Sequence, residues 1–334
     1  MEDDDDATFQ EWSFDDFEFV RKLGSGGVAS VICAKEKQSH YEVALKIQSD
    51  EGDTFCEYDL HESMDHPNIV KMIDYFFSEK SLGPKDLDNE INEEDPVDKK
   101  IVMIMELCAD GSLFDVIRDA PDGYLDESQA ATFLWDAINA IEHVHNKGII
   151  HCDIKSLNFL VSDGKLKLCD FGMSVRKEER EIVGGSPMYM SWEHLKAWKF
   201  MTDDFDERVD IYSLGIILYE MVLGYLPYEV IQDDNNEDFD SLLDGFDKLG
   251  LDDSIEDQFK SPVLDIRNLE NDTEGEPIYI PPPIFPDFIS AECQDLMQRM
   301  AEPIVDDRIT ISEIKKHPWI MHHVPAAASH GNSS

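Results

Sequence analysis

The segment HCDIKSLNFLVSDGKLKLCDFG, residues 151–172, constrains the fold more than any other part of the chain. Apolar residues alternate on both sides of a central Asp-Gly pair, which predicts two antiparallel strands joined by a tight turn. Such a hairpin brings the loops at its two ends to the same edge, so Asp153, Asn158 and Asp170 come close together. A carboxylate and a carboxamide there can hold Mg²⁺ against phosphate oxygens, while the other carboxylate accepts a proton from a hydroxyl. This is the arrangement that phosphoryl transfer requires.

Two motifs in this segment belong together. The pattern His-x-Asp-x-x-x-x-Asn over residues 151–158, followed by Asp-Phe-Gly at 170–172, resembles the catalytic loop and the magnesium loop of the eukaryotic protein kinases. The resemblance implies an α+β fold of two lobes, with a small β-rich amino-terminal lobe and a larger helical carboxy-terminal lobe. The roles that it assigns are proton acceptor for Asp153, stabilisation of transferring charge for Lys155, and Mg²⁺ binding for Asn158 and Asp170.

A lysine and a glutamate upstream match the family's phosphate-binding pair. Lys46 lies in the predicted strand EVALKIQ, and by resemblance it bridges the α and β phosphates of ATP. Glu57 lies in a helix predicted to end before His66-Pro67, in the position that pairs with the lysine and orients it. Glu62 is the alternative partner. Only ten residues separate Lys46 from Glu57, which indicates a shortened approach to this helix.

Other segments match the parts of the family that surround ATP. GSGGVASV fits the glycine-loop pattern only in part, since Ala29 stands in place of the third glycine, and alone it predicts a simple β-turn. By resemblance Met105 is the gatekeeper behind the adenine, and residues 106–108 form the hinge between the lobes. The residues expected to bind ATP are Leu23, Gly24, Ser25, Gly26, Gly27, Val31, Ala44, Lys46, Met105, Glu106, Cys108 and Leu160.

Helical periodicity follows in the second half of the chain. It predicts a helix over 126–147 that ends at Gly148, an almost wholly apolar and therefore buried helix over 208–223, and a helix over 290–300 capped by its first serine. A capping box of threonine and glutamate begins a short last helix over 310–319.

The segment GSPMYMSWE resembles the family's peptide platform, whose sequence pattern is GTPxYMAPE. Ser186 replaces the threonine, and together with Lys155 this small hydroxyl favours the serine/threonine type. By resemblance Glu193 pairs with Arg308 and anchors the segment. Asp210 matches the family's aspartate that reaches the backbone of the catalytic loop.

One kinase domain accounts for most of the 334 residues. Six cysteines show no metal-binding spacing, so a reducing compartment is the default. The acidic amino terminus lacks a leader and no long apolar run follows, so neither secretion nor a membrane span is expected, and the protein is placed in the cytoplasm or nucleus. The expected parts are an acidic tail over 1–16, a kinase domain over 17–320 with lobes 17–107 and 108–320, acidic insertions at 79–100 and 229–285, and a disordered tail over 321–334.

The net charge of −45 bears on partners and not on fold. Such a surface repels nucleic acids and anionic lipids and attracts basic protein substrates; the alternative is that the acids only aid solubility. Residues 233–257 hold eleven acids and one lysine, yet their apolar residues follow one helical face. This segment is either a flap docked on the lobe or an acidic motif for a partner. A monomer is expected.

Three functions are compatible with the motifs. An active serine/threonine kinase that uses ATP and Mg²⁺ requires Lys46, Asp153 and Asp170, and all three are present. A pseudokinase that serves as a nucleotide-binding scaffold is the second, and its mark would be the loss of one of these residues. A kinase for small molecules is the third, and the peptide platform disfavours it.

Cys152 is the clearest departure from the family, which usually has arginine there. That arginine grips a phosphate on the activation segment and makes activity conditional on phosphorylation, which cysteine cannot do. The sequence therefore predicts activity without that modification. The alternative is that Cys152 is a neutral packing substitution and that control lies elsewhere.

Overall fold

The computed structural model describes residues 12–25, 29–49, 54–79, 99–179, 184–227, 229–231, 263–265 and 285–324. The chain divides into two compact units, one made of Met1–Ser63 and Lys71–Leu107, the other of Met64–Val70 and Cys108–Ser334. No helix within the described ranges is long and apolar enough to cross a membrane.

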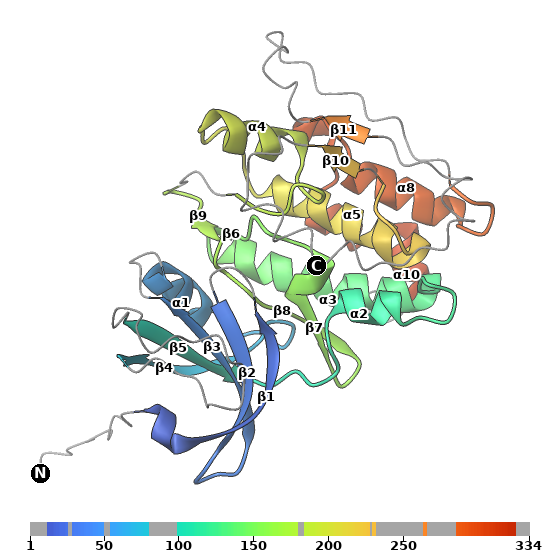
Figure 1. Ribbon diagram of the computed structural model, residues 1–334. Helices are drawn as coiled ribbons and strands as arrows, with labels where there is room; N and C mark the ends of the chain where they lie inside the picture. The colour runs from blue at the N-terminus through green and yellow to red at the C-terminus, as the bar shows by residue number, and fades with distance from the viewer. Residues whose placement is uncertain are drawn as a thin grey trace, which may run out of the picture. The chain divides into compact units, whose positions relative to one another are not determined.

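The first unit is built on an antiparallel sheet of five strands in the order β1-β2-β3-β5-β4 (Figure 1). Its elements are β1 (Phe17–Ser25), β2 (Ala29–Glu36), β3 (Glu42–Ser49), α1 (Thr54–Glu62), β4 (Met72–Ser78) and β5 (Lys100–Glu106). Aromatic and branched side chains from the start of the chain and from the sheet form its core, namely Phe14, Phe17, Leu45, Phe76, Val102 and Ile104. The predicted strand around Lys46 is confirmed as β3, and Met105 lies on β5.

Residues 12–16, which directly precede β1, are folded. Phe14–Asp16 form a 3-10 helix, because the Asp16 carboxylate accepts hydrogen bonds from the backbone N–H and hydroxyl of Ser13 and closes a turn. The Trp12 indole donates to Asp74 at 2.8 Å, and Phe14 is buried. Residues 12–16 therefore belong to the fold, although the predicted tail ran to residue 16.

The second unit is mainly helical. Its helices are α2 (Leu113–Arg118), α3 (Glu127–Asn146), α4 (Trp192–Phe200), α5 (Arg208–Leu223), α8 (Ala291–Met300), α9 (Ile311–Ile314) and α10 (Pro318–His323), with 3-10 turns at Ser156–Asn158 and Val305–Asp307. Helix α5 is buried from its second residue to its last and packs against α3 and α8, as its apolar sequence predicted (Figure 1). Helix α3 ends before Gly148, which takes φ +75°, as expected for a glycine stop.

Short strand pairs complete the second unit. β6 (Ile149–Ile150) pairs with β9 (Val175–Arg176), β7 (Phe159–Ser162) with β8 (Lys165–Leu168), and β10 (Glu229–Ile231) with β11 (Val263–Asp265). The predicted hairpin is confirmed as β7–β8. Its turn residues Asp163 and Gly164 have φ values of +52° and +73°, which is the geometry that an Asp-Gly turn adopts between antiparallel strands.

The end of the fold differs from the prediction. The capping box of Thr310 and Glu313 begins α9 as predicted, but helix α10 then starts at Pro318 and runs to His323. Proline in the first turn starts a helix as readily as it ends one, because the N–H that it lacks has no helical partner there. Residues 321–324 are thus folded, although they were assigned to the tail. Gly26 and Gly27, the acidic stretch 80–98 and the segment 233–257 lie outside the described residues, so the predictions about them stay predictions.

Candidate active site

In the first unit, Lys46 and Glu57 form the predicted ion pair. The Lys46 Nζ lies 2.6 Å from Glu57 Oε1, and the two side chains are only 12% and 6% exposed. Strand β3 supplies the lysine and the first turn of α1 supplies the glutamate. Because the pair is removed from water, its attraction is screened less than that of a surface pair. Glu62, the alternative partner, is not needed for this contact.

Other predicted nucleotide-binding residues of the first unit lie on the strands beside Lys46. Ala44 on β3 faces Met105 on β5 across the ladder, and both are buried. Gly24 pairs with Val31 where β1 and β2 meet, next to the exposed Leu23 and to Ser25, the last residue of β1. Glu106 ends β5 and accepts a hydrogen bond from the backbone N–H of Lys71 through its side chain. Of the second unit's two candidates, Cys108 is buried and Leu160 lies on β7.

In the second unit, the catalytic loop brings Asp153, Lys155 and Ser186 together. The Lys155 ammonium lies 2.8 Å from Asp153 Oδ2 and donates to the Ser186 hydroxyl at 2.9 Å, and that hydroxyl donates to Asp153 Oδ1 at 2.8 Å. Sequence reasoning used Ser186 only as a marker of the serine/threonine type and missed this contact, since no local pattern relates positions 153 and 186. The aspartate is mostly buried, so these donors hold its carboxylate in one orientation.

Asn158 and Asp170 have the atoms that a hard cation needs. The Asn158 amide nitrogen donates to the backbone oxygen and to Oδ2 of Asp153, at 2.8 and 3.0 Å. These two bonds orient the amide and leave its oxygen as the atom suited to a cation. Asp170 follows β8, is exposed, and takes φ +65°, an uncommon conformation that sets it apart from the strand. A carboxylate and an amide oxygen fit Mg²⁺ bound to phosphates.

Asp210 at the start of α5 holds the backbone of the catalytic loop, as the resemblance implied. Its two carboxylate oxygens accept from the backbone N–H groups of His151 and Cys152 at 2.9 and 3.0 Å, and the His145 ring lies 2.8 Å away. Although burial by itself raises the pKa of Asp210, the hydrogen bond from His145 and the neighbouring histidines hold that pKa below its usual value. Cys152 takes φ +67° between these anchors, so the carboxylate secures a strained backbone position.

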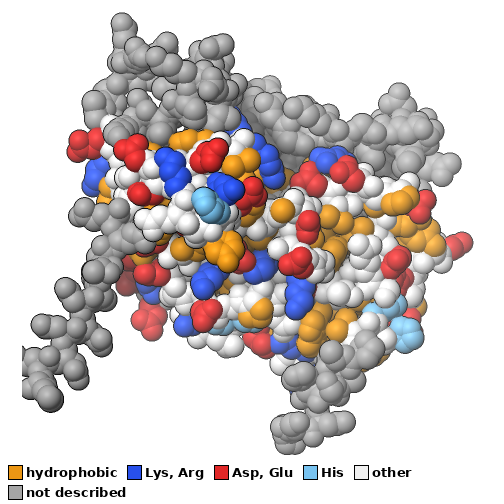
Figure 2. All heavy atoms as spheres, turned by 90° about the horizontal axis from the view of Figure 1, so that it is seen from below, with side chains coloured by type: hydrophobic (Ala, Val, Ile, Leu, Met, Phe, Trp, Pro, Cys, Tyr) orange, Lys and Arg blue, Asp and Glu red, His pale blue; other side chains and the backbone are white. Residues whose placement is uncertain are grey.

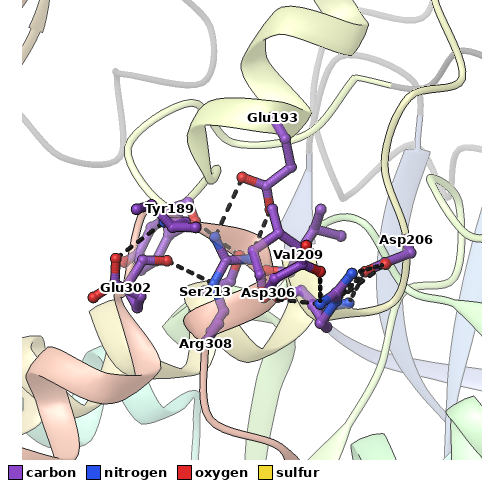
Figure 3. Close-up of polar contacts among 11 residues, drawn as sticks. Tyr189, Glu193, Asp206, Val209, Ser213, Glu302, Asp306 and Arg308 are labelled. Atoms are coloured by element: carbon purple, nitrogen blue, oxygen red, sulfur yellow. Dashed lines mark hydrogen bonds and ion pairs between the residues drawn. The ribbon is translucent and has the colours of Figure 1, made fainter. Parts of the chain in front are cut away.

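Arg308 ties the peptide platform to the rest of the second unit (Figure 3). Its buried guanidinium contacts both oxygens of Glu193 at 2.6 and 3.3 Å, as predicted, and donates to the backbone oxygens of Glu302 and Arg208. A separate ion pair joins Arg208 to Asp206 at 2.7 Å, and Figure 3 labels this aspartate. The Arg308 guanidinium is fully buried and Glu193 is 15% exposed, against 30% and 34% for Arg208 and Asp206, so the attraction in the Arg308 pair is screened less by water.

Comparison with known proteins agrees with this geometry. The protein kinase domain model matches residues 17–320. The chain is 28% identical to an Aurora kinase of Candida glabrata over 94% of this chain and 73% of that protein. It is 26% identical to an Aurora kinase of Saccharomyces cerevisiae, over 95% of this chain and 72% of the relative, and 27% identical to the serine/threonine-protein kinase Aurora-1 of Arabidopsis thaliana, over 95% and 90%. The chain therefore belongs to the protein kinase domain family, and it is an ATP-dependent protein kinase of the serine/threonine type.

Proposed function

We propose that Asp153 accepts the proton of a serine or threonine hydroxyl in a protein substrate while the ATP γ-phosphate is transferred to that oxygen. The contact of Asp153 with Lys155 and Ser186 carries this proposal, because it places a proton acceptor and a cation next to each other. Lys155 stabilises the charge on the transferring phosphate, and Ser186 holds both side chains in register. Lys46, oriented by Glu57, binds the ATP phosphates.

Asn158 and Asp170 are the residues that would hold Mg²⁺, which supplies positive charge against the phosphate oxygens. The orientation of the Asn158 amide by Asp153 supports this assignment. A pseudokinase that binds nucleotide as a scaffold is the alternative. The intact set of Lys46, Asp153 and Asp170 favours the active enzyme.

Transfer of radiolabelled phosphate from ATP to a positional peptide library tests the assignment of Asp153. We expect Asp153→Asn to abolish labelling, because an amide cannot accept the proton. Labelling unchanged by that substitution would mean that the active site lies elsewhere.

Two further variants separate phosphate binding from metal binding. Lys46→Met and Asp170→Ala are each expected to abolish transfer, the first by misplacing the phosphates and the second by removing a metal ligand. Thermal unfolding with ATP, with and without Mg²⁺, distinguishes them. If Mg²⁺ raises the melting temperature of Asp170→Ala as much as that of the wild type, Asp170 is not a ligand.

We also propose that activity needs no phosphate on the segment between Asp170 and Glu193. Cys152 has no positive charge with which to bind a phosphate. It lies in an apolar cluster with five other side chains, namely Ile150, Val175, Ala197, Phe205 and Val209. The segment's hydroxyls are also occupied or buried. Ser174 donates to the His151 backbone, Ser186 bonds Asp153, Tyr189 bonds Glu220, and Ser191 is fully buried.

Protein made in bacteria and treated with phosphatase is therefore expected to keep its activity. The measurement is made on the wild type, because Cys152→Arg would bury a guanidinium among apolar side chains and lower stability. Where that variant folds, we expect no phosphate dependence from it. Loss of activity on dephosphorylation, restored by a phosphate between residues 173 and 191, would contradict this proposal.

The acidic composition supports basic protein substrates, and the segment 229–285 is a candidate site for a partner. A monomer in the cytoplasm or nucleus remains our proposal for the assembly and location of the protein. Size-exclusion chromatography with light scattering checks the first point.

A further inference from the structure

Both carboxylate oxygens of Glu57 are held by strand β3. Lys46 contacts Oε1 at 2.6 Å, and the Gln48 side-chain amide donates to Oε2 at 3.0 Å. Side chains two residues apart on a strand point to the same face, so β3 presents an ammonium and an amide to one carboxylate. Gln48 is 8% exposed and Glu57 6%, so this second hydrogen bond lies out of water.

The Gln48 amide, the second donor, matters because Glu57 lies in the first turn of a short helix. Glu57 is the fourth residue of α1, which has only nine residues, Thr54–Glu62. If one flexible lysine were the only group holding the carboxylate, the Glu57 side chain could rotate about its own bonds, and the lysine ammonium would move with it. A hydrogen bond to the second oxygen removes that freedom and satisfies a buried acceptor. An apolar side chain at position 48 would do neither.

We propose that Gln48 is a positioning residue for phosphoryl transfer: it holds Glu57 in the orientation that keeps the Lys46 ammonium in place for the ATP phosphates. The proposal rests on the phosphate-binding role proposed for Lys46. Gln48 itself touches neither ATP nor substrate in this account, and it acts through Glu57.

Steady-state kinetics of Gln48→Met test the proposal, since methionine has a similar length and no donor. Loss of one hydrogen bond to a charged group predicts that kcat/KM for ATP falls roughly tenfold to a hundredfold. KM for the peptide should stay unchanged. Gln38→Met is the matched control, because Gln38 is an exposed residue of the turn between β2 and β3. The melting temperatures of both variants show whether a fall in kcat/KM comes from lower stability of the folded protein.

A double-mutant cycle with Glu57→Gln separates positioning from packing. If Gln48 acts through Glu57, then Gln48→Met has little further effect in the Glu57→Gln background. Gln48→Glu supplies the second readout, because its protonated acid can donate to Glu57 and its ionised form repels it. Its kcat/KM for ATP is expected to recover, relative to Gln48→Met, as the pH is lowered.

The outcomes distinguish this inference from the proposed function. If Lys46→Met keeps its activity, the role of Lys46 is wrong and Gln48 has nothing to position. If Lys46→Met is inactive while a folded Gln48→Met stays within about twofold of the wild type, or the two substitutions of the cycle are additive, only the role of Gln48 is overturned. Should Gln48→Met fail to fold, Gln48→Glu alone decides through its pH profile, and a profile parallel to that of the wild type contradicts the proposal.

Discussion

Glu220 lies fully inside the second unit, where its two carboxyl oxygens meet the hydroxyls of Ser156 and Tyr189 at 3.0 and 2.8 Å. Removal from water disfavours the ionised form and raises the pKa of Glu220 to about 7, even though both hydroxyls pull it down. Burial also raises the pKa of Tyr189, so the tyrosine stays neutral. At the residue scale, this buried polar cluster joins the platform residue Tyr189 to Ser156, which lies in the 3-10 turn next to the catalytic Asp153.

The first prediction follows from that raised pKa. The folded state favours protonated Glu220, so the stability from this group is fully present below the ordinary pKa of 4.5 and is lost as the pH rises through about 7. Glu220→Gln keeps the shape and removes the titration. Relative to the wild type, we expect this variant to gain up to about 3 kcal/mol of unfolding free energy between about pH 4 and about pH 8.

Urea unfolding at both pH values measures this difference. Tyr219→Phe, one residue away, is the control, because the Tyr219 hydroxyl bonds Tyr225 and burial raises the pKa of Tyr219 far above this range. The same difference between variant and wild type at both pH values would mean that folding does not raise the pKa of Glu220.

At the scale of elements, helices α3 and α5 both end at a glycine in the left-handed region, yet the two ends differ. Gly148 after α3 has φ +75° and open space where a side chain would begin. Gly224 after α5 has φ +79°, and a Cβ there would lie 2.1 Å from the backbone oxygen of Gly123. The first glycine is needed for its backbone conformation alone, whereas the second also allows another segment to approach α5 closely.

The second prediction compares the two ends. Gly148→Ala is expected to cost about 1 kcal/mol, the usual cost of a left-handed residue with a side chain. Gly224→Ala should cost several times more, roughly 3 kcal/mol or above, because the backbone near Gly123 must move. Denaturant unfolding of the two single variants measures both. Equal losses would show that the approach of Gly123 to α5 is not tight.

At the scale of the molecule, the described surface is less one-sided than the composition. On the face drawn in Figure 2, Lys and Arg side chains lie among the Asp and Glu side chains. The sequence concentrates acids in two stretches, eight in residues 79–100 and eleven in 233–257, which fall largely outside the described residues. An effect of charge on substrate choice would therefore come in large part from these stretches.

The third prediction is that basic peptides are preferred and that their kcat/KM falls as salt rises. Screening shortens the reach of charges to about 10 Å at 0.1 M salt, so the attraction of an acidic surface weakens. Kinetics with matched basic and neutral peptides over a salt series measure the effect, and replacing the acids of 233–257 by Asn and Gln should reduce it. A peptide library that favours acidic flanks would contradict the prediction.

The sequence by itself determined the features that depend on neighbouring residues. Alternation and an Asp-Gly turn specified the β7–β8 hairpin, periodicity and a glycine stop specified α3, and a capping box specified the start of α9. Family motifs predicted the pairs Lys46–Glu57 and Glu193–Arg308. The errors came at the ends of elements. Residues before Phe17 form a short turn, and Pro318 starts a further helix. The ends of elements are the least certain part of such a prediction, because the last turn of an element can form or fray at little cost in free energy.

Outside the family motifs, only the tertiary structure decided which distant polar groups meet. Ser156 and Glu220 are 64 residues apart, and Ser186 and Asp153 are 33 apart, so no local pattern relates them. In the sequence Gln48 is an ordinary strand residue. Its role becomes visible only in the fold, where Glu57 of α1 lies within hydrogen-bond distance of it. The physical reason is that a buried polar atom must find a donor or acceptor within about 3 Å, and packing of whole elements settles which one is there.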